Sequence, residues 1–322
     1  MDKRLIVFRA DAGEQIGYGH FVRTLALADI LKEEFECVFV TQTPTDYQKK
    51  EIEKICSLIE LPSNNSKFSI FREMLSGKEL VVLDNYFYST EYQRKIKNKG
   101  CRLVCVDDMH DKHYVADAVI NYGLDERQML DVEPYTKLFV GLDWALIREP
   151  FRSSRFMQKR EKGHIVISFG GVDRNNFTTK ISKIIASSSK VHRITAIVGD
   201  AFLFEEELGA VDKIKIERNL TAFQLADLFC RVEFAILSSS TICIEALACK
   251  CVVFAGWYTE NQKGVYQYLL KERRIIGIGF LDDRTIYSLP AVLEKRNEDN
   301  SIEKWETQDI SKRYIQAFHE MW

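Results

Sequence analysis

Two glycines and a histidine near the start of the chain have the types and spacing to do chemistry. Gly17 and Gly19 come just before His20, where an apolar strand-like run gives way to a helical pattern. Glycine lets backbone approach a ligand closely, and a helix start offers unpaired N–H groups to an anion. The dinucleotide fingerprint does not apply, because Val22 or Arg23 replaces its third glycine. Since histidine moves protons near neutral pH, the stretch predicts proton transfer on a phosphorylated ligand. A structural histidine is the alternative.

A hydroxyl-rich run in the second half is the other candidate anchor for a ligand. Ser239, Ser240 and Thr241 come just before or at the start of a helical pattern, and Glu245 falls one turn further on. Hydroxyl and N–H groups at a helix start can bind phosphate oxygens without a metal. A carboxylate in that helix could accept hydrogen bonds from the two ribose hydroxyls. An ordinary N-cap, with Glu245 stabilised near the positive helix end, is an equal alternative.

Polar and small residues follow other strand-like runs. Asp11 could orient His20, bind sugar hydroxyls or cap the following loop. Tyr86 could project from a strand end toward a ligand or pack in the core. Gly170 and Gly171 form a second glycine turn, so the second half opens as the first half does. Doubly wound sheets bind ligands at the carboxyl ends of their strands, which is where all these residues are expected.

A metal site would have to use the acidic pair Asp107 and Asp108, with His110 or His113. Adjacent strand residues point to opposite faces of a sheet, so one site rarely uses both aspartates. A solvated loop explains the two histidines more simply. The sequence therefore predicts a site without a metal and without a cofactor.

The elements that hold these residues follow from the apolar patterning. In the first half, strand-like runs cover residues 5–8, 37–41, 80–83, 103–106 and 118–120. Helical patterns lie between them, at 21–34, 47–59, 67–75 and 90–99. Nearly continuous Val, Ile and Leu in the strands, with amphipathic helices between, predict a parallel sheet covered on both faces.

The same alternation restarts at residue 164 and continues to residue 278. A polar, basic stretch at 151–162 separates the two halves, and we place a hinge there. We predict an α/β protein of two doubly wound, parallel-sheet domains that face each other across a cleft. Their expected limits are 1–152 and 153–322. The long last helix, around 302–322, is a candidate to pack back on the first domain.

Composition narrows the class of protein further. The chain has 322 residues, is 46% hydrophobic and carries a net charge of −2, which argues against nucleic-acid binding. Apolar runs stay below membrane-spanning length, and the charged start leads straight into a strand, so we expect neither membrane insertion nor a signal peptide. The eight cysteines show no CxxC pair, which predicts reduced thiols in a cytoplasmic protein. The sequence leaves the oligomeric state open, with a monomer as one hypothesis.

Taken together, the motifs resemble the UDP-sugar hydrolases of pseudaminic acid biosynthesis. The opening of that family is similar to residues 9–11 and 16–23, which end just past His20. Further similar blocks follow in family order at 83–86, 144–149, 170–173, 238–247 and 261–262. The block around His20 is fairly specific, whereas the block at 238–247 is shared with GT-B glycosyltransferases of the MurG type.

The resemblance implies a GT-B fold made of two Rossmann-like domains. It also implies hydrolysis of UDP-2,4-diacetamido-2,4,6-trideoxy-β-L-altropyranose to UDP and the free sugar. The family's catalytic histidine corresponds to His20, its cleft tyrosine to Tyr86, and its asparagine near the sugar to Asn261. The small-molecule UDP-sugar is then the expected partner.

These residues suggest an inverting hydrolysis at the anomeric carbon. His20 would take a proton from water, while Tyr86 and Asn261 orient water and sugar. The helix start at Thr241 would stabilise the leaving UDP without a metal, and Arg148, beside the hinge, is the nearby cationic candidate. Two alternatives stay open: a UDP-sugar glycosyltransferase of the MurG type, and a non-catalytic nucleotide-sugar binding protein.

Overall fold

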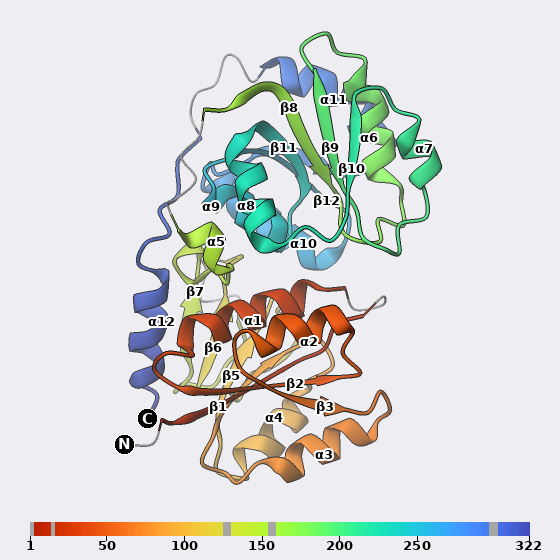
Figure 1. Ribbon diagram of the computed structural model, residues 1–322. Helices are drawn as coiled ribbons and strands as arrows, with labels where there is room; N and C mark the ends of the chain where they lie inside the picture. Colours follow the sequence, from red (N-terminus) through yellow and green to blue (C-terminus); the bar gives the residue numbers. More distant parts are fainter. Residues whose placement is uncertain (1–2, 14–16, 125–129, 154–158, 296–301) are drawn as a thin grey trace. The chain divides into compact units, whose positions relative to one another are not determined.

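The chain forms two compact units in the computed structural model (Figure 1). Residues 3–13, 17–124, 130–153, 159–295 and 302–322 are described. Unit 1 comprises Met1–Glu149 and Gln308–Trp322, and unit 2 comprises Pro150–Thr307. The division therefore falls at 149/150, where the sequence suggested 152/153, and the last helix belongs to unit 1.

Unit 1 is built on a parallel sheet. In the part of the chain that the structure describes, its strand order is β3-β2-β1-β4-β5-β6-β7. These strands are β1 (Leu5–Ala10), β2 (Glu36–Gln42), β3 (Ser57–Leu61), β4 (Leu80–Asp84), β5 (Arg102–Val106), β6 (Ala118–Asn121) and β7 (Lys137–Val140). The helical elements are α1 (Gly19–Leu31), α2 (Asp46–Glu53), α3 (Ser66–Met74), α4 (Thr90–Lys97), the 3₁₀ turn η2 (Leu142–Trp144) and α12 (Ile310–His319).

Unit 2 repeats the architecture, with the described strand order β10-β9-β8-β11-β12-β13. Its strands are β8 (Glu161–Ser168), β9 (Arg193–Ile197), β10 (Ile214–Glu217), β11 (Val232–Ser238), β12 (Val252–Trp257) and β13 (Ile276–Phe280). The helices are α5 (Glu149–Arg152), which begins at the last residue of unit 1, α6 (Phe177–Ala186), α7 (Glu205–Gly209), α8 (Ala222–Arg231), α9 (Thr241–Ala248), α10 (Glu260–Lys271) and α11 (Asp283–Lys295). The strand pairs in both sheets are parallel, as the apolar patterning predicted.

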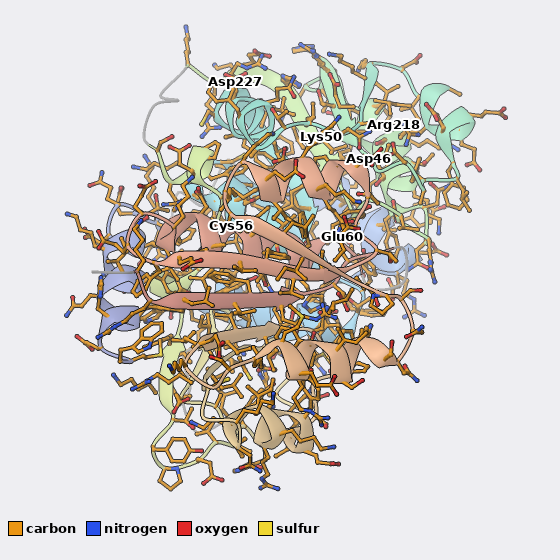
Figure 2. All side chains as sticks on the ribbon, turned by 60° about the horizontal axis from the view of Figure 1, so that its bottom comes forward. Asp46, Lys50, Cys56, Glu60, Arg218 and Asp227 are labelled. Atoms are coloured by element: carbon orange, nitrogen blue, oxygen red, sulfur yellow. The ribbon has the colours of Figure 1, made fainter. Side chains whose placement is uncertain are left out.

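The two edge strands of unit 1 were missed in the sequence. The predicted helix at 47–59 is wrong at its end, because α2 stops at Glu53 and Ser57–Leu61 pairs with β2. Both β3 and β7 are half exposed, so they lack the continuous apolar run that identifies a buried strand. Cys56 and Glu60 lie at this open edge of the sheet, beside α2 with its Asp46 and Lys50 (Figure 2).

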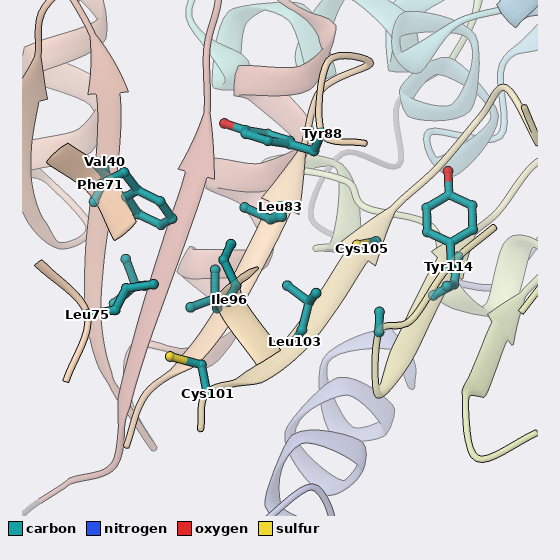
Figure 3. Packing of buried hydrophobic residues seen from close by; sticks show 14 of the residues in the cluster. Val40, Phe71, Leu75, Leu83, Tyr88, Ile96, Cys101, Leu103, Cys105 and Tyr114 are labelled. Carbon is teal, nitrogen blue, oxygen red and sulfur yellow. The ribbon is translucent and has the colours of Figure 1, made fainter. Parts of the chain in front are cut away.

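One apolar core of unit 1 lies where α3 and α4 pack against the sheet. Phe71 of α3 and Ile96 of α4 are fully buried in a cluster that includes Val40, Leu83 and Leu103 of the strands (Figure 3). The corresponding core of unit 2 contains side chains of β8, β11, β12, α6 and α11. The central strands are therefore closely packed, and this packing sets the positions of the residues at their carboxyl ends.

The last helix, α12, packs on α1 inside unit 1. Phe318 is fully buried and makes an edge contact with Phe35, at 6.5 Å between ring centres. The hydroxyl of Tyr314 donates a hydrogen bond of 2.6 Å to the Trp144 carbonyl. α12 thus packs on the helix that carries His20, and it also contacts the residues just after that helix and η2.

Replacing Phe318 by alanine should destabilise unit 1 strongly. Loss of a fully buried phenylalanine removes apolar contact and leaves a cavity, at a cost of about 3–5 kcal/mol. Urea unfolding of Phe318→Ala against the parent chain measures this cost. The matched control is Phe223→Ala on α8, because that side chain is 60% exposed. An equal effect of the two substitutions would contradict the packing of α12 described here.

Candidate functional site

The carboxyl ends of β1 and β4 bring the first group of polar residues together. These strands are neighbours in parallel register, with Ala10 opposite Asp84. Asp11 follows β1 directly, and Asp84 is the last residue of β4. After β1, the chain turns and enters α1 at Gly19, so His20 lies in the first turn of this helix.

The glycine turn before α1 has a backbone conformation that favours glycine. Gly17 has a φ of +81°, and its N–H donates to the Gly13 carbonyl at 2.7 Å. A Cβ at Gly17 would meet open space, so a substitution there would be limited by backbone strain rather than by a clash. Gly19 begins the helix and is exposed. Ile16, the first residue of the motif, lies outside the described residues.

His20 is buried and bound to Asp84. The distance from Nδ1 to the Asp84 carboxylate is 2.6 Å, and Asp84 is completely buried. Burial opposes ionisation of Asp84, but the positive charge of Arg23 and the hydrogen bond from His20 lower its pKa to about 2. An ionised carboxylate at this distance accepts a hydrogen bond from Nδ1 in the tautomer that carries its proton there. That tautomer has its lone pair on Nε2, the arrangement that a general base needs.

Arg23 joins the two carboxylates of the site. Its Nε and Nη2 atoms each donate to Asp84 at 2.6 Å, and Nη1 donates to Asp108 at 2.8 Å. Thr24 adds a hydrogen bond of 2.8 Å to Asp84. The sequence analysis gave Arg23 and Asp84 no specific role and considered Asp108 only as a metal ligand. One available signal was the three-residue spacing of His20 and Arg23, which puts both side chains on one face of a helix.

Tyr86 lies against His20. The two rings meet edge to face, with their centres 4.5 Å apart. The Tyr86 side chain is 40% exposed, and its hydroxyl lies 3.4 Å from the Asp108 carboxylate. Tyr86 thus belongs to the group around His20 and also reaches the surface of unit 1.

Asp11 belongs to a separate buried network. Arg9 donates to both of its carboxylate oxygens, Lys67 reaches one of them at 3.2 Å, and the Gln42 N–H donates at 2.9 Å. Burial opposes ionisation of Asp11, but Arg9 and its hydrogen bond lower the pKa of this carboxyl. The contact to His20 that the sequence suggested for Asp11 is made by Asp84.

The Asp107 side chain holds together the turn that follows β5. Its carboxylate accepts hydrogen bonds from His110 and Tyr114, at 2.7 and 2.6 Å, and from Asn121 at 3.0 Å. Burial opposes ionisation, but these donors hold the pKa of Asp107 well below its usual range. Across the described residues, no group of three His, Cys, Asp or Glu side chains is arranged to hold a metal ion.

In unit 2, the glycine turn leads to α6, whose first N–H groups are bound by a side chain of the protein. Gly170 has a φ of +95°, and the Gly171 carbonyl accepts from the Gly199 N–H at 2.9 Å. At the start of α6, the N–H groups of Phe177 and Thr178 donate to the Asp173 carboxylate, at 3.0 and 2.7 Å. This carboxylate already satisfies the positive end of α6.

The start of α9 differs, because Ser240 precedes it without a side-chain capping bond. Ser239 is buried, and its N–H and hydroxyl both donate to the Gly256 carbonyl, so it holds β11 to β12. Ser240 and Thr241 are half-buried at the helix start, and Glu245 is buried one turn further on. Of the three hydroxyl residues, only Ser240 and Thr241 are therefore partly accessible at the start of α9.

Two remaining candidates lie on other elements. Asn261 is the second residue of α10, which follows β12, the neighbour of β11. The starts of α9 and α10 therefore lie at the same end of the sheet in unit 2. Arg148 is half-buried and precedes α5, in unit 1.

The two parallel-sheet units, each with a glycine turn after its first strand, have the layout of the GT-B fold. MurG of Acinetobacter baumannii shares it with a TM-score of 0.66 over 98% of this chain and 99% of MurG, at 10% identity. A putative UDP-N-acetylglucosamine 2-epimerase of Listeria monocytogenes gives 0.67 over 99% of this chain and 96% of that protein, at 12% identity. The predicted fold is confirmed. No protein-family model matches the chain.

The sequence relatives include a UDP-sugar hydrolase and a polysaccharide biosynthesis protein. The chain is 26% identical to the UDP-2,4-diacetamido-2,4,6-trideoxy-β-L-altropyranose hydrolase of Campylobacter jejuni, over 83% of this chain and 96% of that enzyme. It is 29% identical to the spore coat polysaccharide biosynthesis protein SpsG of Bacillus subtilis, over 56% of this chain and 54% of SpsG. An uncharacterized protein of Methanocaldococcus jannaschii is 27% identical over 83% of this chain, which spans 58% of that protein's length.

Among the described helices, none combines the length and the apolar character needed to cross a membrane.

The Asp84 carboxylate should make stability depend on pH. Its folded pKa of about 2 lies below its ordinary value of 3.8, so ionisation contributes about 2 kcal/mol of stability above pH 4. This contribution is lost as the pH falls from about 4 to about 2. Asp84→Asn should therefore unfold in less urea than the parent at pH 7, and the difference should shrink over that window. The control is Asp283→Asn, because that carboxylate is 78% exposed. A gap that stays constant down to pH 2 would disprove the role of the ionised form.

Proposed function

We propose that this protein hydrolyses a UDP-sugar at the anomeric C–O bond and releases UDP and the free sugar. The observation that carries the proposal is the 2.6 Å contact between the His20 Nδ1 and the Asp84 carboxylate, which supports the tautomer with its lone pair on Nε2. The sugar of the Campylobacter relative, 2,4-diacetamido-2,4,6-trideoxy-L-altrose, is the first substrate to test.

In the proposed reaction, Nε2 of His20 takes a proton from water as the water oxygen attacks the anomeric carbon. The C–O bond to the diphosphate breaks, and its electron pair leaves on the β-phosphate oxygen of UDP. The imidazolium that forms is stabilised by the Asp84 carboxylate 2.6 Å away. General-base help of this kind contributes about 10²–10⁴-fold to a rate. Attack from the side opposite UDP inverts the anomeric carbon, and Tyr86 and Asn261 are assigned to orient water and sugar.

We assign the nucleotide to unit 2. Ser240 and Thr241 stand at a helix start without a side-chain cap, where N–H groups and the helix dipole favour a diphosphate. The start of α6 is a weaker candidate, because the Asp173 carboxylate occupies it. Glu245 is assigned to the ribose hydroxyls, with Gly170, Gly171 and Arg148 as further contacts. No metal is required in this scheme.

A UDP-sugar glycosyltransferase is the second candidate, because MurG and other glycosyltransferases share the fold. In that reaction, an acceptor hydroxyl takes the place of water, and His20 serves as the same base. Release of UDP from a panel of UDP-sugars without any acceptor separates the two functions. UDP that appears only when an acceptor is added would replace hydrolysis by transfer, and a protein that binds but never releases UDP would be a sensor.

His20→Asn should retain UDP binding and lose turnover by a factor of about 10² or more, since the base is used only in the transition state. UDP release measures the loss, and calorimetry measures the affinity. His113→Asn is the control, because His113 pairs with Asp131 and Glu133 in a separate, partly exposed cluster. Near-normal turnover of His20→Asn would remove His20 from the mechanism.

Glu245→Ala should weaken UDP and UDP-sugar alike, because both carry the ribose. Loss of hydrogen bonds to a charged group corresponds to about a 10- to 100-fold higher Kd. Titration calorimetry with UDP measures this change. Glu207→Ala, on the exposed face of α7, should leave the Kd unchanged. Unchanged UDP binding in Glu245→Ala would favour a purely structural role for this carboxylate.

A reaction in ¹⁸O-water distinguishes cleavage of the anomeric C–O bond from attack at the β-phosphorus. We expect the label in the anomeric hydroxyl of the released sugar and none in UDP, because the base is assigned to water at carbon. Mass spectrometry of both products measures this. Label in the β-phosphate of UDP would mean attack at phosphorus and would refute the role assigned to His20.

A further inference from the structure

Five side chains of unit 1 contact one another in a closed cycle, and Arg23 is the member that pairs with both carboxylates. His20 contacts Asp84, Asp84 pairs with Arg23, and Arg23 pairs with Asp108. The Tyr86 hydroxyl lies 3.4 Å from Asp108, and the Tyr86 ring meets the His20 ring at 4.5 Å. The cycle joins α1, the end of β4 and the segments that follow β4 and β5.

Arg23 positions the Asp84 carboxylate, and Asp84 in turn positions the His20 imidazole. Its two-pronged contact to Asp84, at 2.6 Å on each oxygen, sets the plane of the carboxylate. The Arg23 Nη2 also lies 2.9 Å from the His20 Nδ1, so Arg23 contacts the imidazole directly as well as through Asp84. A lysine could not reproduce this fork, because an ammonium is a single point charge.

On the Tyr86 side, Arg23 fixes a second carboxylate. Its Nη1 donates to Oδ2 of Asp108, the same oxygen that the Tyr86 hydroxyl approaches. The Asp108 side chain is 13% exposed, whereas that of Asp84 is completely buried. One guanidinium thus reaches the base through one carboxylate and the exposed tyrosine through another.

We propose that Arg23, held between Asp84 and Asp108, is a positioning residue that fixes His20 and Tyr86 relative to each other. The proposal rests on the hydrolysis proposed above for its kinetic consequence. Arg23 itself is buried and acts through its neighbours. A plain structural ion pair would need Asp84 alone, and the second carboxylate with its tyrosine contact is what distinguishes a positioning group.

Nuclear magnetic resonance tests the geometry without any substrate. With ¹⁵N-labelled histidine, and His20 assigned by comparison with His20→Asn, we expect one neutral tautomer with its proton on Nδ1. Arg23→Gln should lose this single state, and Asp108→Ala should lose the cross-peaks between the His20 and Tyr86 rings. Asp108→Ala leaves Arg23 paired with Asp84, so this variant keeps the test available if Arg23→Gln fails to fold.

The kinetic arm compares Asp108→Ala, Tyr86→Phe and the double variant. We expect Asp108→Ala to lower kcat by about tenfold or more, with KM changed by less than about twofold, because misplaced groups slow the reaction without weakening binding. The double variant should be little slower than the slower single variant, because the two side chains act as one group. The matched control is Asp111→Ala, an exposed carboxylate of the same segment that pairs with Lys112.

Three results would overturn the proposal: an unchanged His20 tautomer in Arg23→Gln, unchanged ring cross-peaks in Asp108→Ala, or fully additive losses in the double variant. A parent protein that hydrolyses no UDP-sugar would refute the proposed function instead. In that case, the resonance measurements still decide whether Arg23 positions the two rings.

Discussion

The ion pair between Arg23 and Asp84 is the interaction on which the site of unit 1 depends. Both groups are buried, so each charge would be very costly without the other. Together they tie the first turns of α1 to the end of a central strand. Because Arg23 keeps Asp84 ionised, the carboxylate can accept a hydrogen bond from the Nδ1 of His20. The tautomer proposed for the imidazole therefore depends on a salt bridge one turn away.

A second His–Asp pair in the same unit shows what sets the His20–Asp84 pair apart. His110 lies 2.7 Å from Asp107, at a distance close to that of His20 from Asp84. Asp107, however, also accepts from Tyr114, Asn121 and two backbone N–H groups, so this pair ties a turn together. His20 stands instead at a helix start behind a glycine turn, with an exposed aromatic ring against it. Both aspartates lie at a strand end, so the helix start and the aromatic ring beside His20 are what separate the two pairs.

The fold could be predicted from sequence because buried parallel strands leave an unmistakable apolar pattern. The central strands β1, β4, β5 and β11 were found for this reason, whereas the edge strands β3 and β7 were missed because solvent on one side relaxes that pattern. The site was predicted less completely. His20 and the helix start at Thr241 follow from local spacing. The Asp84–Arg23–Asp108 connection was missed, because it depends on which strand ends lie beside α1, across 61 to 85 residues of sequence.

The packing of α12 on α1 has a consequence for the order in which the chain becomes structured during synthesis. Unit 2 is continuous in sequence, while unit 1 is completed only by residues 308–322. A chain that has emerged as far as residue 307 therefore has every residue of unit 2, yet the helix bearing His20 still lacks its backing partner. Domains usually acquire their structure in the order in which they are made. Here, unit 1 begins before unit 2 and is completed after it, and the proposed base gains its full support only with residues 308–322.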